Sequence, residues 1–141
     1  MRTPFAITLS AVLLGGCFGA PPNEKLLAGL CQDIFVGDTE VIGMLAGEAG
    51  TDIDTYCNCY AASIVSDLAK TSVHKDVLNE IAVAREGTMR GAEDAAGHVE
   101  ELIKSGEIDT FTEDQLDAIG EDFQRISEAM NENGGACPVA D

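Results

Sequence analysis

Residues 111–130 read FTEDQLDAIGEDFQRISEAM, and their apolar side chains recur with the period of an α-helix. Successive apolar positions lie three or four residues apart, which places them on one helical face. These positions are Leu116, Ile119, Phe123, Ile126 and Met130. Thr112 and Gln115 form a capping box, and Phe111 with Leu116 occupies the positions of a hydrophobic staple. The pattern covers only two heptads, so we expect this face to pack on its own domain's core rather than form a coiled coil.

Outward from this segment, the chain from Asn23 onward keeps the helical spacing and lacks the alternating pattern of strands. Apolar periodicity, capping residues and glycine stops predict six short helices. We place them at about residues 23–35, 39–48, 51–70, 72–85, 91–104 and 112–132. Gly50 is expected to end the second helix, and Thr51 is the expected N-cap of the third. The sequence therefore predicts an all-α fold of about five to six short helices.

The chain is strongly acidic: its 141 residues carry 25 Asp and Glu against 8 Lys and Arg, a formal charge of −17. The hydrophobic fraction of 45% is ordinary for a globular protein, so this charge does not by itself predict disorder. The basic residues are scattered from Arg2 to Arg125. Because nucleic-acid binding needs Lys and Arg gathered on one face, that function class is excluded.

The N-terminus has the pattern of an export signal. Residues 1–16, MRTPFAITLSAVLLGG, join one basic residue to an apolar run from Phe5 to Leu14. The longest uninterrupted apolar stretch, 5–20, has sixteen residues, just short of the roughly 17 needed to span a bilayer. An ordinary signal-peptidase site after Ala20 fits poorly, because it would place the bulky Phe18 three residues before the cut.

The four residues Leu14-Gly15-Gly16-Cys17 resemble the lipobox of bacterial lipoproteins, in which Leu and two small residues precede a Cys. The resemblance implies that the Cys17 thiol receives a diacylglycerol and that cleavage makes Cys17 the new N-terminus, commonly acylated with a chain such as palmitate. It divides the chain into a signal peptide at 1–16, a tether at 17–22 and a helical domain at 23–141. An unmodified Cys17 within a plain signal peptide is the alternative.

The remaining cysteines predict two disulfides. Setting Cys17 aside leaves Cys31, Cys57, Cys59 and Cys137, an even number in a chain expected in an oxidising compartment. Cys57 and Cys59 point roughly 200° apart on a helix, so they cannot bond to each other. Cys57 lies on an apolar face, as Cys31 does, whereas Cys59 lies nearer the polar side. This favours Cys31–Cys57 with Cys59–Cys137, and the crossed pairing stays open.

Redox or metal chemistry of free thiols is the alternative to structural disulfides for the same cysteines. A Cys-x-Cys pair such as Cys57 and Cys59 can act as a labile dithiol, and with Cys31 and His74 or His98 it offers soft metal ligands. No Lys, Arg or His lies adjacent to lower a thiol pKa, and zinc sites usually space their cysteines more widely. We therefore predict no metal and no cofactor.

The acidic residues do not form a calcium-binding loop. With Gly106 at the sixth position of an EF-hand, Ile103 would occupy a ligand position and Thr112 would replace the bidentate acid. Two clusters of acidic residues are expected on solvated outer faces of helices. They are Glu93, Asp94, Glu100 and Glu101 in the first group, and Glu121, Asp122 and Glu128 in the second.

We assign no catalytic residue. His74 and His98 are expected on polar faces without an acid-base partner. No phosphate-binding loop, nucleophile elbow or zinc-protease helix occurs in the sequence.

Three functional hypotheses remain. The first is a non-enzymatic interaction or structural module of the bacterial cell envelope, held on the membrane by its N-terminal lipid. Because Phe18 is not Asp, the lipoprotein resemblance implies an outer-membrane location facing the periplasm. The second is an acidic periplasmic binding protein for a cationic ligand, peptide or basic protein, since the charge would steer such partners. The third is a thiol-redox or metal-binding protein. We expect a monomer in each case.

Overall fold

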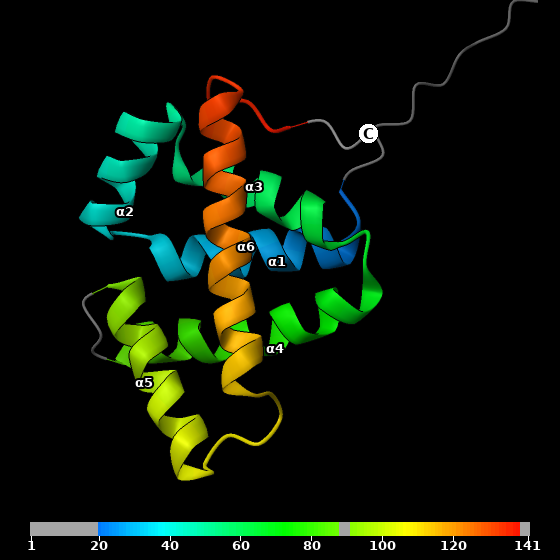
Figure 1. Ribbon diagram of the computed structural model, residues 1–141, viewed down its shortest axis with the longest axis vertical. Coiled ribbons are helices and arrows are strands. Elements are labelled where there is room, and N and C mark those ends of the chain that lie inside the picture. The colour runs from blue at the N-terminus through cyan, green and yellow to red at the C-terminus, as the bar shows by residue number, and fades with distance from the viewer. Residues whose placement is uncertain (1–19, 88–90, 139–141) are drawn as a thin grey trace, which may run out of the picture.

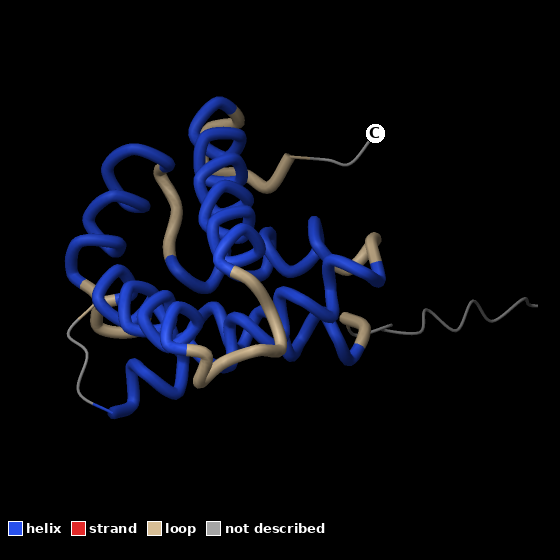
Figure 2. Tube along the Cα trace, turned by 60° about the horizontal axis from the view of Figure 1, so that its bottom comes forward, coloured by secondary structure: helices blue, strands red, loops and turns tan. Residues whose placement is uncertain are grey.

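The computed structural model describes residues 20–87 and 91–138, which form helices joined by loops and turns, with no strand among them (Figures 1 and 2). The elements are α1 (Pro22–Phe35), α2 (Thr39–Met44), the π-helical turn η1 (Leu45–Ala49), α3 (Ile53–Ile64), α4 (Leu68–Gly87), α5 (Ala92–Ser105) and α6 (Glu113–Glu132). The prediction of an all-α fold is confirmed. No helix in these two ranges combines the length and the apolar character needed to cross a bilayer.

The ends of several helices follow the expected local chemistry. At the start of α6 the hydroxyl of Thr112 accepts a hydrogen bond from the amide of Gln115, and the Gln115 side chain accepts one from the Thr112 amide at 2.9 Å. Gly50 ends η1 in the left-handed conformation with φ 63°, which glycine adopts without steric cost. The N-cap of α3 is Asp52 rather than Thr51, because the Asp52 carboxylate accepts a hydrogen bond from Thr55 N at 2.7 Å.

The boundary between α3 and α4 differs from the prediction. One helix was expected to continue to about residue 70, yet α3 ends at Ile64 and α4 already begins at Leu68. The physical reason is Asp67, whose carboxylate accepts hydrogen bonds from the amides of Ala69 and Lys70 at 3.0 and 3.1 Å. An acid that satisfies the free amides of a first turn favours a new helix start at that point.

α1 packs mainly on α3 and α4, while α6 crosses over these helices (Figure 1). Beside α6 lie η1 at one end and α5 at the other. Four aromatic rings meet in the middle of the domain; they belong to Phe35, Tyr56, Tyr60 and Phe123. The rings of Tyr60 and Phe123 stack with centroids 4.1 Å apart, and the Tyr56 hydroxyl donates a 2.7 Å hydrogen bond to the Phe123 carbonyl.

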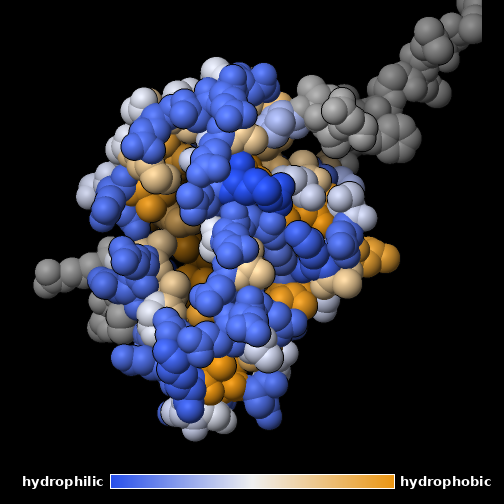
Figure 3. Space-filling model, in the orientation of Figure 1, coloured by the Kyte–Doolittle hydropathy of each residue, from blue (hydrophilic) through white to orange (hydrophobic). Residues whose placement is uncertain are grey.

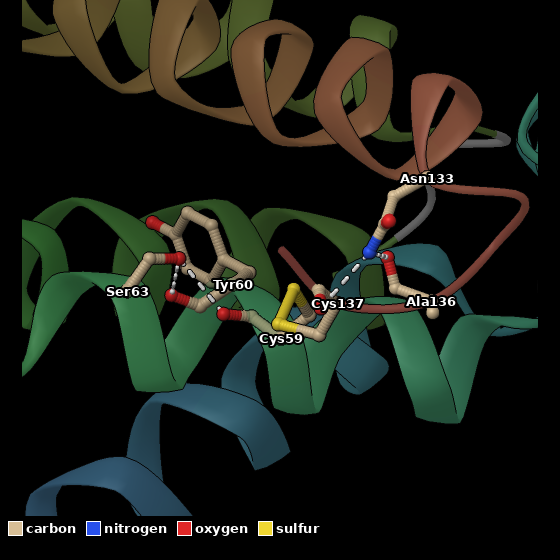
Figure 4. Close-up of a disulfide and its surroundings, with 6 residues drawn as sticks. All are labelled: Cys59, Tyr60, Ser63, Asn133, Ala136 and Cys137. Carbon is tan, nitrogen blue, oxygen red and sulfur yellow. Dashed lines mark hydrogen bonds between the residues drawn. A yellow bond between two sulfur atoms is a disulfide. The ribbon is translucent and has the colours of Figure 1, made fainter. Parts of the chain in front are cut away.

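Two disulfides staple the bundle. Cys31–Cys57 joins α1 to α3, and Cys59–Cys137 joins α3 to the segment after α6, with Cα atoms 5.6 and 5.4 Å apart. These are the pairs that the helical faces favour, and the crossed pairing does not occur. The segment after α6 is also held by Asn133, whose amide nitrogen donates to the carbonyls of Ala136 and Cys137 (Figure 4).

Candidate functional site

A groove runs along α6, and we call it the α6 groove. It consists of two hollows, of about 950 Å³ between α5 and α6 and about 390 Å³ between α2–η1 and α6. Both are lined by Phe35 and Phe123, so the hollows meet at this pair of rings. Figure 3 shows hydrophobic residues at the bottom of a hollow beside α6, with hydrophilic residues on both sides.

The lining of the α6 groove is apolar at its floor. Ile34, Ile81, Leu116 and Ile119 line the larger hollow together with the two shared rings, and Leu45, Val41 and Tyr56 line the smaller one. Ile34, Ile119 and Leu45 are almost fully buried. The floor is therefore the outer surface of the domain's own core.

The edges of the groove are acidic. Seven carboxylates line the two hollows: Glu93, Asp94, Glu100, Glu101, Asp117, Glu48 and Glu128. Among the described lining residues Lys104 is the one Lys or Arg, and it pairs with Glu100 and with Glu113. The hydrogen bond from Lys104 and its charge lower the pKa of Glu100, so this carboxylate stays ionised. The edges thus carry a large excess of negative charge.

Two glycines widen the larger hollow. Gly97 lies in the middle of α5 and Gly120 in the middle of α6, and both line this hollow. A Cβ atom added at either position would meet no atom within 4 Å, so neither glycine is required by packing. Glycine inside a helix is less favourable than Ala by about 1 kcal/mol. The two glycines therefore make α5 and α6 less stable than alanines would, and they leave the groove open at both positions.

Asp38 positions α5 relative to α2, and hence the sides of the groove. Its Oδ1 accepts from the amides of Glu40 and Val41 at the start of α2, while its Oδ2 accepts from the Ala92 amide at the start of α5. Burial raises the pKa of Asp38, but these backbone hydrogen bonds outweigh that effect and leave the pKa lowered. One ionised carboxylate thus fixes the first turns of two helices.

A second polar constellation is buried between α3, α4 and α6. The Tyr60 hydroxyl forms a hydrogen bond with Nδ1 of His74, whose Nε2 lies 3.2 Å from Oδ2 of Asp122. Lys70 and Arg125 form ion pairs with the same Asp122 carboxylate. The prediction that His74 and Asp122 lie on solvated faces is wrong, because both are less than a tenth exposed.

Nε2 of His74 faces a carboxylate, which can only accept, so the proton of the ring is assigned to Nε2, and Nδ1 of the neutral ring accepts from the Tyr60 hydroxyl. Burial lowers its pKa, and the nearby charge of Asp122 only partly offsets this. Burial raises the pKa of Asp122, but the hydrogen bonds from Arg125 and Lys70 outweigh that effect and leave the pKa lowered. Tyr60 is fully buried and its pKa is raised by that burial, so its hydroxyl offers no nucleophile to a substrate. We interpret this constellation as a structural element of the core.

The sequence does contain a signal for these two buried residues. Asp122 stands three residues after Ile119 and four before Ile126, so it falls on the apolar face of its helix. His74 likewise precedes Val77 and Leu78 by three and four residues. The groove itself carries no comparable signal, because its two sides belong to helices that meet only in the folded chain.

The cysteines predicted as site residues fall into two groups. Cys17 lies outside the described residues, so its lipidation stays a prediction. Cys31, Cys57, Cys59 and Cys137 are all in disulfides, and their sulfurs are not available as thiolate ligands in this state. Within residues 20–87 and 91–138, no three His, Cys, Asp or Glu side chains come together in a way that could hold a metal ion.

No family model matches the chain, and neither a curated protein nor a solved structure matches it. The function must therefore be inferred from the residues of the chain itself.

Proposed function

We propose that the protein is a lipid-anchored protein of the bacterial envelope whose helical domain acts as a non-enzymatic interaction or structural module. One observation carries the proposal. The four cysteines of the described residues pair with one another, and the fifth, Cys17, stands in the lipobox-like Leu14-Gly15-Gly16-Cys17. Disulfides persist in oxidising compartments, which agrees with export.

The proposed tether keeps the domain close to the membrane. Five residues, 18–22, reach at most roughly 18 Å at about 3.6 Å per residue, and α1 already begins at Pro22. Removal of residues 1–16 removes Arg2 and no acid, so the processed chain has 25 acidic and 7 basic residues, a charge of −18. Anionic lipid head groups repel such a domain over a Debye length of about 8 Å. In this proposal the acyl chains alone hold the protein at the surface.

The experiment is membrane fractionation of cells that produce the Cys17→Ser variant. The wild type is expected in the membrane fraction, because two or more acyl chains give stable attachment whereas one is marginal. The variant is expected as soluble or unprocessed protein, and Gly19→Ser, in the same tether, is expected to fractionate as the wild type. Intact-mass spectrometry of the wild type must show an added lipid on Cys17. An unmodified Cys17 would contradict the proposal.

The second candidate function, a binding protein for a cationic ligand or basic protein, is favoured by the acidic edges of the α6 groove. Electrostatic steering predicts that capture of such a partner weakens steeply as salt is raised. Crosslinking of envelope membranes at low and at high salt, followed by purification of this protein, separates the two candidates. A purely structural module would capture the same neighbours under both conditions.

The third hypothesis, thiol-redox or metal chemistry, needs free thiols. It is tested by alkylating protein taken directly from cells before any oxidation can occur. Two or more alkylated cysteines in residues 23–141 would support it, and fully protected cysteines would count against it.

A further inference from the structure

We propose that the α6 groove binds a cationic amphipathic segment of another envelope protein. Apolar side chains of that segment enter the hollow between α5 and α6, and its basic side chains meet the acidic edges. The inference rests on the proposed function as an interaction module, and it names the surface and the chemistry of the partner.

The first argument is shape. Because the larger and the smaller hollow share Phe35 and Phe123, the groove is elongated and spans from α5 to η1. An extended or helical peptide can lie along such a groove, whereas a compact small molecule would fill one hollow only. Recognition of an amphipathic helix by an apolar groove is a recurring mode of peptide binding.

The second argument is the pair of glycines. Gly97 and Gly120 leave backbone accessible from the groove, with open space where a side chain would stand. A large apolar side chain of a partner can therefore reach the floor between α5 and α6. There it would contact Ile119 and Phe123 and lose its own exposure to water, which is the main source of affinity in such grooves.

The third argument is charge complementarity, and it selects among occupants. Glu93, Asp94, Glu101 and Asp117 line the larger hollow, and none of them forms an ion pair with a Lys or Arg within residues 20–87 and 91–138. A second copy of this chain, with its charge of −17, would be repelled, and an anionic lipid surface would be repelled as well. A segment rich in Lys and Arg is attracted.

The fourth argument is the position of the groove relative to the proposed anchor. The tether joins α1 at Pro22, whereas Ile34 and Phe35, which line the groove, lie at the opposite end of this 14-residue helix. A helix of that length extends about 20 Å. The groove thus lies a helix length from the point of attachment, where a partner can approach without crossing the lipid head groups.

The test uses the full chain in phosphatidylcholine vesicles and a fluorescein-labelled peptide of about 18 residues, built from Lys and Leu with the Leu residues on one helical face. Fluorescence anisotropy measures its binding, with empty vesicles as background. A scrambled peptide of the same composition and a Glu-and-Leu peptide are the controls. We expect binding of the amphipathic Lys-and-Leu peptide, weakened as salt rises, and little binding of the other two.

Two pairs of matched variants locate the binding. Gly97→Leu and Gly120→Leu narrow the groove and should each weaken binding by at least about tenfold. The control Gly29→Leu, in α1 with equally open space, should change binding by less than about twofold.

The second set of variants tests the charge of the groove edges. The double variant Glu93→Gln with Glu101→Gln should weaken binding and flatten its salt dependence. The control, Asp54→Asn with Asp76→Asn, removes the same charge from exposed positions that do not line the groove. Circular dichroism checks that each variant is folded.

The outcomes decide between the groove and its alternatives. Equal binding of the scrambled peptide, or unchanged binding by folded Gly97→Leu and Gly120→Leu protein, would overturn the groove as the site. Preferential binding of the acidic peptide would overturn the charge argument. These failures would leave membrane attachment through Cys17 intact, whereas an unmodified Cys17 would overturn the proposed function without affecting peptide binding.

Discussion

The carboxylate of Asp38 accepts a 2.9 Å hydrogen bond from the backbone amide of Ala92, 54 residues further along the chain. The same carboxylate caps α2 through Glu40 and Val41, so one side chain sets the start of two helices. Neither helix end has another side-chain cap in the described structure, since the N-cap of α5 is Gly91. The docking of α5, which forms one side of the α6 groove, thus depends on a residue of the loop after α1.

Asp38→Ala should destabilise the domain by about 2 kcal/mol, because it leaves amides of two helices without their acceptor. Urea unfolding followed by circular dichroism measures the change. Asp33→Ala, an exposed position on α1, is the control and should change stability by less than about 0.5 kcal/mol. Similar values for the two variants would contradict a capping role for Asp38.

The domain should lose stability as the pH falls below about 6.5, the ordinary pKa of His. The folded state lowers the pKa of His74, so the unfolded chain binds its proton more readily and acid favours unfolding. The stabilisation that neutral His74 provides is complete above about pH 6.5, and it decreases as the pH falls towards the lowered pKa that His74 has in the folded state. The groups that face His74 are Tyr60, Asp122 and Lys70, and Arg125 acts through its ion pair with Asp122.

The carboxylate of Asp122 also makes the domain less stable as the pH falls, but at lower pH than His74. Its pKa is lowered in the folded state, so its stabilising effect is lost only below about 3.8. Thermal melts between about pH 7.5 and 5 therefore isolate His74. His74→Gln should melt at a lower temperature at pH 7.5 and show a flatter decrease on acidification, with His98→Gln as the control. A wild-type melting temperature that rises between pH 7.5 and 5 would contradict the neutral state of His74.

The disulfide between α3 and the segment after α6 should contribute more stability than the one between α1 and α3. It spans 78 residues of sequence against 26, and loop-closure entropy gives upper values of about 4.5 and 3.5 kcal/mol. Removal of Cys59–Cys137 by two Ala substitutions, compared with the same change at Cys31–Cys57, measures the difference in urea. Peptide mapping of non-reduced protein should recover no link between Cys57 and Cys59.

Gly135→Ala should destabilise the domain more than Gly134→Ala. Both glycines have positive φ, 87° and 65°, so both substitutions bear the cost of a left-handed Ala, about 1 kcal/mol. Only at Gly135 would the added Cβ also collide with backbone, since it would lie 2.9 Å from the Ala49 carbonyl oxygen and closer still to that of Gly50. Thermal unfolding of the two variants separates collision from backbone strain, and equal effects would show that the close approach is unimportant.

Local sequence patterns were sufficient for most of the fold. The capping box of Thr112 and Gln115, the glycine stop at Gly50 and the three-four spacing of α6 depend on residues within one or two helical turns. Helical faces excluded a bond between Cys57 and Cys59 and favoured the observed disulfide pairs, but only the structure excluded the crossed pairing. The break between α3 and α4 was missed, although Asp67 carried a local capping signal.

The tertiary structure alone decided how side chains from distant segments meet. The sequence determined that the described part of the chain folds into helices with an acidic exterior, since helical periodicity and charge are properties of neighbouring residues. It did not determine that Asp38 would hold Ala92, or that Gly97 and Gly120 would line one hollow. These relations depend on the docking of α5 against α4 and α6, which is set by the burial of core side chains and has no counterpart in the local spacing of residues.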